Sequence, residues 1–355
     1  MDKFAQLSTE DRKDILGEAA KRMDLSEIII EKDFWVCWTL KQLFQNPNIS
    51  EYLTFKGGTS LSKGYDAISR FSEDIDLTIS RNAPFLRDGG NPLEDGISGN
   101  ERKRRIEKLS LNAQKFIQEV VKPELHKDIT DALGTDDGWN VEFDDSDPDG
   151  QTLLFHYPKA FNYGGGFGSG RYGVGSYGEG QTGYIKPQIK LEFGARGDIE
   201  PNEKRSIKPY AANIFPDEFE EPTYEVSMLG AERTFWEKAT ILHALYHNLK
   251  LRDRMSRHYY DTYMLDQKGI AEKALQAPDL LAHVVRNKSV MFKEPKASYE
   301  TAIIGSLKLV PPKEHIDKLS DDYGKMQEMF MDEHPSFEEI IEKLTMLEEQ
   351  INKAK

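Results

Sequence analysis

The order of apolar and polar residues predicts that helices and short strands alternate in the first part of the chain. Residues 9–24 form a charged helical stretch that Thr9 can cap, and residues 25–45 form a second, more apolar helix. A short strand at 52–55 then precedes a glycine pair and a further helix over 59–69. We therefore expect two helices, a strand and a turn ahead of the first alternating segment.

Alternation of apolar and polar residues predicts more strands beyond this turn. In residues 74–80 the apolar side chains face one side, whereas Asp74, Asp76 and Thr78 face the other. Residues 136–158 indicate a hairpin, with two strands around a turn rich in Asp, Gly and Pro. These segments together predict a sheet.

A helical segment and a glycine-rich segment interrupt these strands. Residues 101–135 are largely helical, and residues 184–193 form another alternating strand whose polar face carries Lys190 and Glu192. Residues 163–183 contain ten glycines, too many for regular structure. We interpret them as a flexible insertion between two strands.

After residue 200 the pattern becomes mainly helical. A Pro-rich connection over 201–226 leads to helical periodicity that continues to the end, where Ser336 can cap the last helix. The first three of these helices are expected at 229–249, 255–268 and 270–283. The whole pattern predicts an α+β fold, with a mixed β-sheet core in residues 1–200 and a mainly helical C-terminal domain in 201–355.

Composition and charge narrow the possible environments and partners. The 355 residues are 38% hydrophobic and 30% charged, and no apolar run is long enough for a membrane span. The N-terminus lacks a signal-peptide core, and Cys37 is the single cysteine, so we expect a cytoplasmic protein without disulfides or membrane partners. The net charge of −14 argues against general binding to nucleic acid. Basic stretches at 101–108 and 247–258 are more typical of solvated surface than of RNA sites.

The segment FKGGTSLSKGYDAISRFSEDIDLTIS, residues 55–80, combines two features of a phosphate site. Gly57 and Gly58 allow a ligand to approach the backbone closely, and free N–H groups at the start of the next helix favour phosphate. Thr59 and Ser60 add hydroxyl groups to this turn. The segment matches neither a Walker A loop nor a dinucleotide-binding fingerprint.

The strand that follows supplies the second feature, a pair of acids. Asp74 and Asp76 are two residues apart, so both carboxylates project from one face of the strand. Oxygen ligands of this kind suit Mg²⁺ or Mn²⁺ bound together with substrate phosphates. We therefore predict that the turn holds a triphosphate and the aspartates hold its metal ions.

Two later helices contain charged residues in unusual places. Lys238 lies within the apolar arc of its helix, where a lysine must reach solvent or meet an anion. Arg257 and Asp261 are four residues apart and can pair on one helix face. A purely structural pair among the tyrosines of that helix is the alternative.

These motifs resemble those of the AbiEii/AbiGii toxin family of the nucleotidyltransferase superfamily, whose members carry GGT-S/A-L and RFSEDIDL in nearly identical form. Shorter segments also resemble the family: IIEKDFWV, IKLEFGARGDIEP, ERTFWEKATILH and SRHYYDTYML. The likeness covers roughly residues 25–80 and 184–266. It implies a nucleotidyltransferase-like fold and the toxin of a toxin–antitoxin, or abortive infection, pair.

The resemblance also implies roles for individual residues. Glu192 would complete a metal triad with Asp74 and Asp76, although the family's third acid is often aspartate. Lys238 would stabilise charge on the nucleotide, and Asp261 would orient that lysine or the acceptor. The nucleotide-binding set is Gly57, Gly58, Thr59, Ser60, Lys63, Lys190 and Arg257.

The expected reaction transfers a nucleotide from an NTP to an acceptor and releases pyrophosphate. The resemblance suggests a tRNA 3′ end as acceptor and a cognate antitoxin protein as partner. A protein acceptor, an antibiotic-modifying activity on a small molecule, and a non-catalytic NTP-binding protein remain alternatives. Transfer from labelled NTP in the presence of Mg²⁺ and total RNA would distinguish them.

Overall fold

A computed structural model describes residues 1–162, 186–248 and 251–354, so the glycine-rich segment 163–183 lies outside the described residues. The chain forms a seven-stranded mixed sheet with the order β3-β4-β5-β2-β1-β7-β6. The strands are β1 (Leu53–Lys56), β2 (Ile75–Ile79), β3 (Asn140–Phe143), β4 (Thr152–His156), β5 (Ile189–Gly194), β6 (Asn202–Ile207) and β7 (Tyr224–Leu229). β2 and β5 are parallel, as are β1 and β7, and the other neighbours are antiparallel.

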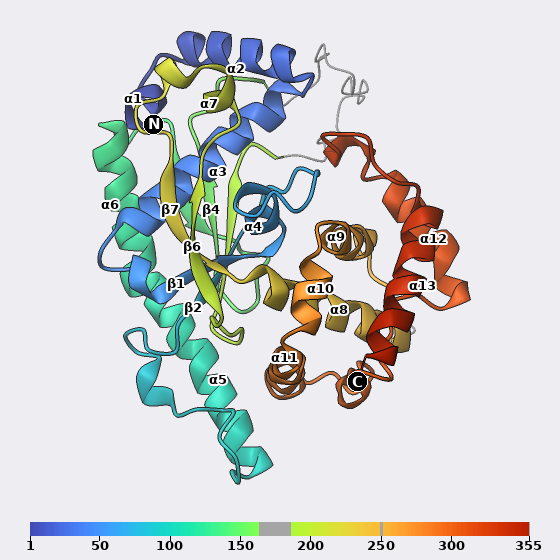
Figure 1. The fold of residues 1–355 in the computed structure, drawn as a ribbon. Helices are drawn as coiled ribbons and strands as arrows, with labels where there is room; N and C mark the ends of the chain where they lie inside the picture. The colour runs from blue at the N-terminus through green and yellow to red at the C-terminus, as the bar shows by residue number, and fades with distance from the viewer. Residues whose placement is uncertain (163–185, 249–250, 355) are drawn as a thin grey trace.

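Helices surround this sheet and form most of the second half of the chain (Figure 1). Those of the first half are α1 (Asp2–Ala5), α2 (Thr9–Met23), α3 (Glu27–Gln45), α4 (Gly57–Lys63), α5 (Gly99–Phe116), α6 (Lys122–Leu133) and α7 (Ala211–Ile214). Those of the second half are α8 (Ala231–His247), α9 (Ser256–Gln267), α10 (Ile270–Leu275), α11 (Pro278–Met291), α12 (Lys313–Gly324) and α13 (Phe337–Lys353). The α+β class expected from the sequence is confirmed.

Alternation along the strands gives the sheet one apolar and one polar face. The apolar face packs against α3, whose buried aromatic residues Phe34, Trp35 and Trp38 lie in a large hydrophobic cluster. The polar face carries Asp76, which the pairing of β2 with β1 places opposite Lys56. Polar side chains therefore line the side of the sheet that α3 leaves uncovered.

A second hydrophobic cluster holds the C-terminal helices together. It is built almost entirely from α8 to α13 and the segments between them, and Figure 1 shows these orange and red helices beside the sheet. Leu61, Ala67 and Ile68 of the first half join this cluster. The loop after α4 is therefore packed against the helical half, which matters for the site described below.

The sheet extends into a stretch that the sequence suggested was a connection. β6 lies in the stretch 201–226 expected to be a connection, and β7 begins in it, so the sheet continues to Leu229. β6 is an edge strand that is exposed along most of its length, and its sequence NEKRSI lacks the apolar alternation that marks a half-buried strand.

Smaller differences concern where helices begin and end. The cap of α2 is Ser8, whose hydroxyl accepts a hydrogen bond from the Asp11 N–H, rather than Thr9. The helix expected at 270–283 is divided, because Pro278 begins α11. Ser336 caps α13 in a complete capping box, as expected. Within the described residues, no helix is long and apolar enough to cross a membrane.

Candidate active site

Two parallel strands bring the predicted acids to one place. Asp76 of β2 lies directly opposite Glu192 of β5, and Asp74 precedes β2 by one residue on the same face. All three carboxylates line a cavity of about 320 Å³ between the sheet and helices α8 and α9. The residue spacing thus places three acids at one wall of a cleft between the two halves.

Burial and mutual repulsion disfavour the charged forms of the two aspartates. Burial raises the pKa of Asp76 to about 7, and the carboxylates of Glu192 and Asp74 add to the rise. The pKa of Asp74 is raised by burial and by its neighbours Glu73 and Glu192. Burial and crowding therefore oppose full ionisation of these acids.

Gly57 and Gly58 leave space that any side chain would fill. Gly57 has φ of +82°, and a β-carbon there would lie 2.0 Å from Oδ2 of Asp76. A β-carbon on Gly58 would lie 2.7 Å from both Nη2 of Arg70 and Oγ of Ser72. The glycine pair therefore allows the carboxylate of Asp76 and the side chains after α4 to approach the turn.

The hydroxyl groups of the turn donate hydrogen bonds to backbone carbonyl oxygens and do not face the cavity. Thr59 Oγ1 donates to the carbonyl oxygen of Asp74 at 2.6 Å, and Ser60 Oγ donates to that of Gly57 at 2.9 Å. Both side chains are buried and neither lines the cavity, whereas Ser72 does. The hydroxyls expected at the phosphate are thus used to fix the turn against β2.

Lys63 also lies away from the cavity. Its Nζ is 2.7 Å from Oδ1 of Asp33 in α3 and 3.5 Å from the ring centre of Tyr210. Both members of this ion pair are buried, and the Tyr210 N–H donates to the other oxygen of Asp33. The lysine expected to bind nucleotide instead joins α4 to α3.

Asp261 holds two cations at the edge of the cavity. Arg70 donates to both of its carboxylate oxygens, at 2.7 and 2.8 Å, and Lys238 Nζ lies 2.8 Å from Oδ2. Burial raises the pKa of Asp261, but the charges of Arg70 and Lys238 outweigh it and lower the pKa well below its usual range. The anion that Lys238 required is therefore Asp261, whose partners are Arg70 and Lys238 and not Arg257.

Six cationic side chains face the cavity, against four carboxylates. The cations are Lys56, Arg70, Lys190, Lys238, Arg254 and Arg257, and the acids are Asp74, Asp76, Glu192 and Glu237. Lys190 contacts Glu192 directly, so the two residues that share a strand face form an ion pair. This balance favours a polyanionic ligand.

At this cavity, buried polar atoms of α9 have no hydrogen-bond partner among the described residues. They are Nε of Arg257 and Nδ1 of His258. Burial, together with the charges of Lys238 and Arg257, lowers the pKa of His258 well below its usual range, so its ring is neutral. Buried polar atoms are normally paired, and these two can bond to a bound ligand.

The three carboxylates are chemically suited to bind a divalent cation. Three carboxylates without Cys ligands are the donor set of Mg²⁺ or Mn²⁺, and a cation would relieve the repulsion that raises the pKa of Asp76. Within the described ranges, however, no three His, Cys, Asp or Glu side chains are close enough together to hold a metal ion. Glu192 contacts Lys190 instead.

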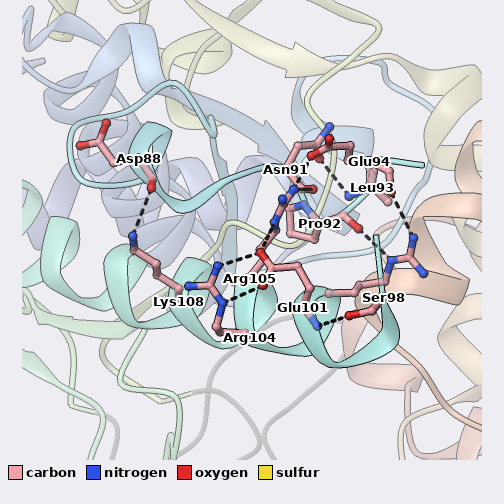
Figure 2. Close-up of polar contacts among 11 residues, drawn as sticks. Asp88, Asn91, Pro92, Leu93, Glu94, Ser98, Glu101, Arg104, Arg105 and Lys108 are labelled. Carbon is pink, nitrogen blue, oxygen red and sulfur yellow. Dashed lines mark hydrogen bonds and ion pairs between the residues drawn. The ribbon is translucent and has the colours of Figure 1, made fainter. Parts of the chain in front are cut away.

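The basic stretch 101–108 is engaged in local contacts, as Figure 2 shows. Arg104 and Arg105 both pair with Glu101, and Arg105 also pairs with Glu94 in the preceding loop. Lys108 donates to the carbonyl oxygen of Asp88. These contacts attach the loop before α5 to the helix, and they support a structural role for this stretch.

Sequence reasoning did not single out several residues that line the cavity. Lys56, Arg70 and Ser72 all lie within the quoted segment 55–80. Arg254 belongs to the second basic stretch, 247–258, which here reaches the cavity instead of solvent alone. Lys56 and Arg70 could have been predicted at the cavity from their position within a few residues of a phosphate-binding motif.

Comparison with known protein families gives a match over most of the chain. A model of the nucleotidyl transferase AbiEii toxin family, of type IV toxin–antitoxin systems, matches residues 38–343. The matched region includes every residue that lines the cavity. No curated protein matches the chain.

Proposed function

The chain belongs to the AbiEii family of nucleotidyl transferase toxins, and we propose that it is a Mg²⁺-dependent enzyme that transfers a nucleoside monophosphate from an NTP to an RNA 3′ end. The observation that carries this proposal is the register of two strands. It sets Asp76 opposite Glu192, with Asp74 beside them, at the wall of a cavity faced by six cations.

The cationic side of the cavity suits the triphosphate. Arg70, Lys238, Arg254 and Arg257 can bond to phosphate oxygens, and the unpartnered Nε of Arg257 supplies one donor. The Gly57–Gly58 turn, which has no side chains, lets the phosphates approach the backbone. Fixed positive charge around the phosphates stabilises the leaving pyrophosphate.

The three carboxylates would hold the divalent cations that accompany the nucleotide. Asp74 and Asp76 would bind both, and Glu192 would complete the one on the acceptor side once it leaves Lys190. Such a cation polarises the phosphoryl oxygens and favours the ionised acceptor hydroxyl. With a pKa of about 7, Asp76 loses its proton readily when a cation binds.

The reaction then exchanges the phosphoanhydride bond between the α- and β-phosphates for a phosphodiester bond to the acceptor. The acceptor hydroxyl oxygen bonds to the α-phosphorus, the bond between the α-phosphorus and the bridging oxygen breaks, and pyrophosphate leaves. Lys238, oriented by Asp261, is placed to stabilise the charge on the phosphates. A tRNA 3′ end is the acceptor we propose, and a cognate antitoxin protein is the partner that would neutralise the enzyme.

Transfer from labelled NTPs tests the proposal directly. Purified protein is incubated with each α-³²P-labelled NTP, Mg²⁺ and total RNA, and label in RNA is measured with and without a chelator. We expect Mg²⁺-dependent labelling of a small RNA, its loss in Asp74→Asn, and its retention in Asp14→Asn, which changes an exposed acid far from the cavity. An Asp74→Asn enzyme that transfers normally would refute the assignment of the acids.

A further inference from the structure

A second cavity lies on the other side of the acids. It has a volume of about 210 Å³ and shares Lys56, Asp76 and Glu192 with the first cavity. Its remaining wall comes from the turn before β4, the loop after β5 and the end of α11. Asp76 and Glu192 therefore border both cavities.

The two cavities differ in charge. Six cations face the first, whereas the second has only Lys56 and Arg196 against three acids, Asp76, Glu192 and Asp149. A triphosphate belongs in the first cavity on this ground. In a phosphoryl displacement the entering and leaving oxygens lie in line on opposite sides of the phosphorus. With pyrophosphate leaving into the first cavity, the attacking hydroxyl must come from the side of the second.

The wall of the second cavity offers an aromatic ring and a guanidinium group. Phe292 is 42% exposed, an unusual position for a phenylalanine. It follows α11, whose last residue Met291 is buried in the core of the sheet half, so the backbone that carries the ring is anchored beside the cavity. Arg196 pairs with Asp149 at 3.8 Å, a long and partly exposed contact that leaves its guanidinium group available.

We propose that this second cavity, defined by Phe292, Arg196 and Gln151, binds the 3′-terminal nucleoside of a single-stranded RNA acceptor. The terminal base stacks on Phe292, the adjoining phosphate bonds to Arg196, and the 3′-hydroxyl points toward Asp76 and Glu192. Stacking on an exposed aromatic ring beside a basic group is how proteins hold single-stranded ends. This inference rests on the proposed nucleotidyl transfer.

The local architecture supports a rigid subsite. Gln151 Nε2 donates to Ser110 Oγ at 2.9 Å, which ties the turn before β4 to α5. Asn287 of α11 donates to the carbonyl oxygen of Arg196 at 3.3 Å and links the helix to the loop after β5. Three separate segments are thus joined around the cavity before any acceptor arrives.

The test separates acceptor binding from NTP binding. Phe292→Ala, Phe292→Trp and Arg196→Ala are compared with wild type, and Leu111→Ala is the control, because Leu111 is an exposed apolar residue (65%) on α5. For each protein, KM for an oligoribonucleotide with a free 3′-hydroxyl, kcat, and the Kd for NTP by calorimetry are measured. We expect KM to rise on the order of 10-fold or more in Phe292→Ala and in Arg196→Ala, with the NTP Kd unchanged. Phe292→Trp and Leu111→Ala should behave like wild type.

The outcomes distinguish a failure of the acceptor subsite from a failure of the proposed nucleotidyl transfer. If wild type labels RNA but Phe292→Ala has an unchanged KM, the subsite is wrong while nucleotidyl transfer stands. Labelling of a protein or an antibiotic in place of RNA overturns the subsite in the same way. If wild type neither binds NTP nor labels any acceptor, the proposed function fails and the subsite fails with it.

Discussion

At the scale of single residues, Asp261 controls how two cations are presented. It is fully buried and accepts hydrogen bonds from Arg70 and Lys238, so the positive charge on one side of the cavity is fixed by one carboxylate. Part of this arrangement could be predicted: a lysine in an apolar arc must meet an anion. Arg70 could not, because its partner lies 191 residues away in the chain.

We expect Lys238→Ala to lower mainly the transfer rate and Asp261→Ala to lower mainly the stability. Without Lys238, Asp261 keeps its bidentate bond to Arg70, and alanine favours the helix, so the melting temperature should change little. The transfer rate should fall about a hundredfold, since a contact to transition-state charge is lost. Asp261→Ala removes the carboxylate that Arg70 and Lys238 share and should cost about 3–5 kcal/mol of stability.

Melting temperature and specific activity, measured together for both variants, check this expectation. Lys238→Arg should recover the transfer rate only in part, because a planar guanidinium group does not replace the compact charge of an ammonium group. A large drop in melting temperature for Lys238→Ala with unchanged specific activity would instead make this lysine structural.

Asp76 should make stability depend on pH. Its folded pKa of about 7 lies above the ordinary aspartate value, so its charged form is disfavoured by folding. Its contribution is therefore most favourable at acidic pH, and it is lost as the pH rises from about 4 to above 7. Without metal, Asp76→Asn should melt higher than wild type at pH 8, and this gain should vanish near pH 4.

Thermal melts of both proteins in a chelator, from pH 4 to pH 8, measure the effect. Asp14→Asn, which removes one exposed acid of α2, is the control for the loss of a single negative charge. Parallel melting curves for wild type and Asp76→Asn at all pH values would contradict the crowding of charge that we describe.

At the scale of elements, the turn between β1 and α4 shows which features sequence patterns reveal. The glycine pair and the acids of β2 stand together in the sequence, and the order strand, turn, helix, strand was predicted correctly. β6 was missed, since an exposed edge strand carries no apolar alternation. The use of Thr59 and Ser60 was also misjudged, because a hydroxyl's partner depends on how the turn packs on β2.

Replacing Gly57 with alanine separates backbone strain from crowding. Gly138 has nearly the same φ, +84° against +82°, but a β-carbon there would meet nothing within 4 Å. Gly138→Ala should therefore cost only the strain of a left-handed residue, about 1–3 kcal/mol. Gly57→Ala should cost more, since its β-carbon would lie 2.0 Å from Oδ2 of Asp76.

Chemical denaturation of the two variants gives the comparison, and calorimetric titration with NTP adds a second reading. We expect Gly57→Ala alone to weaken NTP binding, because Asp76 must move away from the turn. Equal losses of stability with unchanged NTP affinity would show that the close approach has no functional importance.

At the scale of the whole molecule, the site is assembled from both ends of the chain. Arg70 and Phe330 form an isolated antiparallel bridge, in which the Phe71 N–H donates to the Met329 carbonyl and the Met331 N–H donates to that of Ser69. The segment that carries Arg70 is thus held by residues near the C-terminus. Sequence patterns show no sign of this pairing, because a single bridge has no periodicity.

Phe330→Ala should disturb activity beyond its effect on stability. Phe330 is fully buried, with its ring 5.0 Å from that of Tyr260, so its loss should cost about 3–5 kcal/mol. Phe337→Ala removes a buried ring from the same cluster at a distance in sequence from the bridge. At a temperature where both variants remain folded, transfer per folded molecule should fall further in Phe330→Ala. Equal activities would show that the bridge does not position Arg70.

This bridge also determines when, during translation, Arg70 can be anchored at the site. The acids of β2 leave the ribosome well before Phe330, the partner of Arg70 in the bridge, which follows them by roughly 250 residues. At 5–20 residues per second, roughly 10–50 s separate the two events. A polypeptide cut short by a broken messenger carries the acids without the strand partner that anchors Arg70. Synthesis must therefore continue past Phe330 before Arg70 can be anchored beside the acids, and that interval is available for the antitoxin to be made.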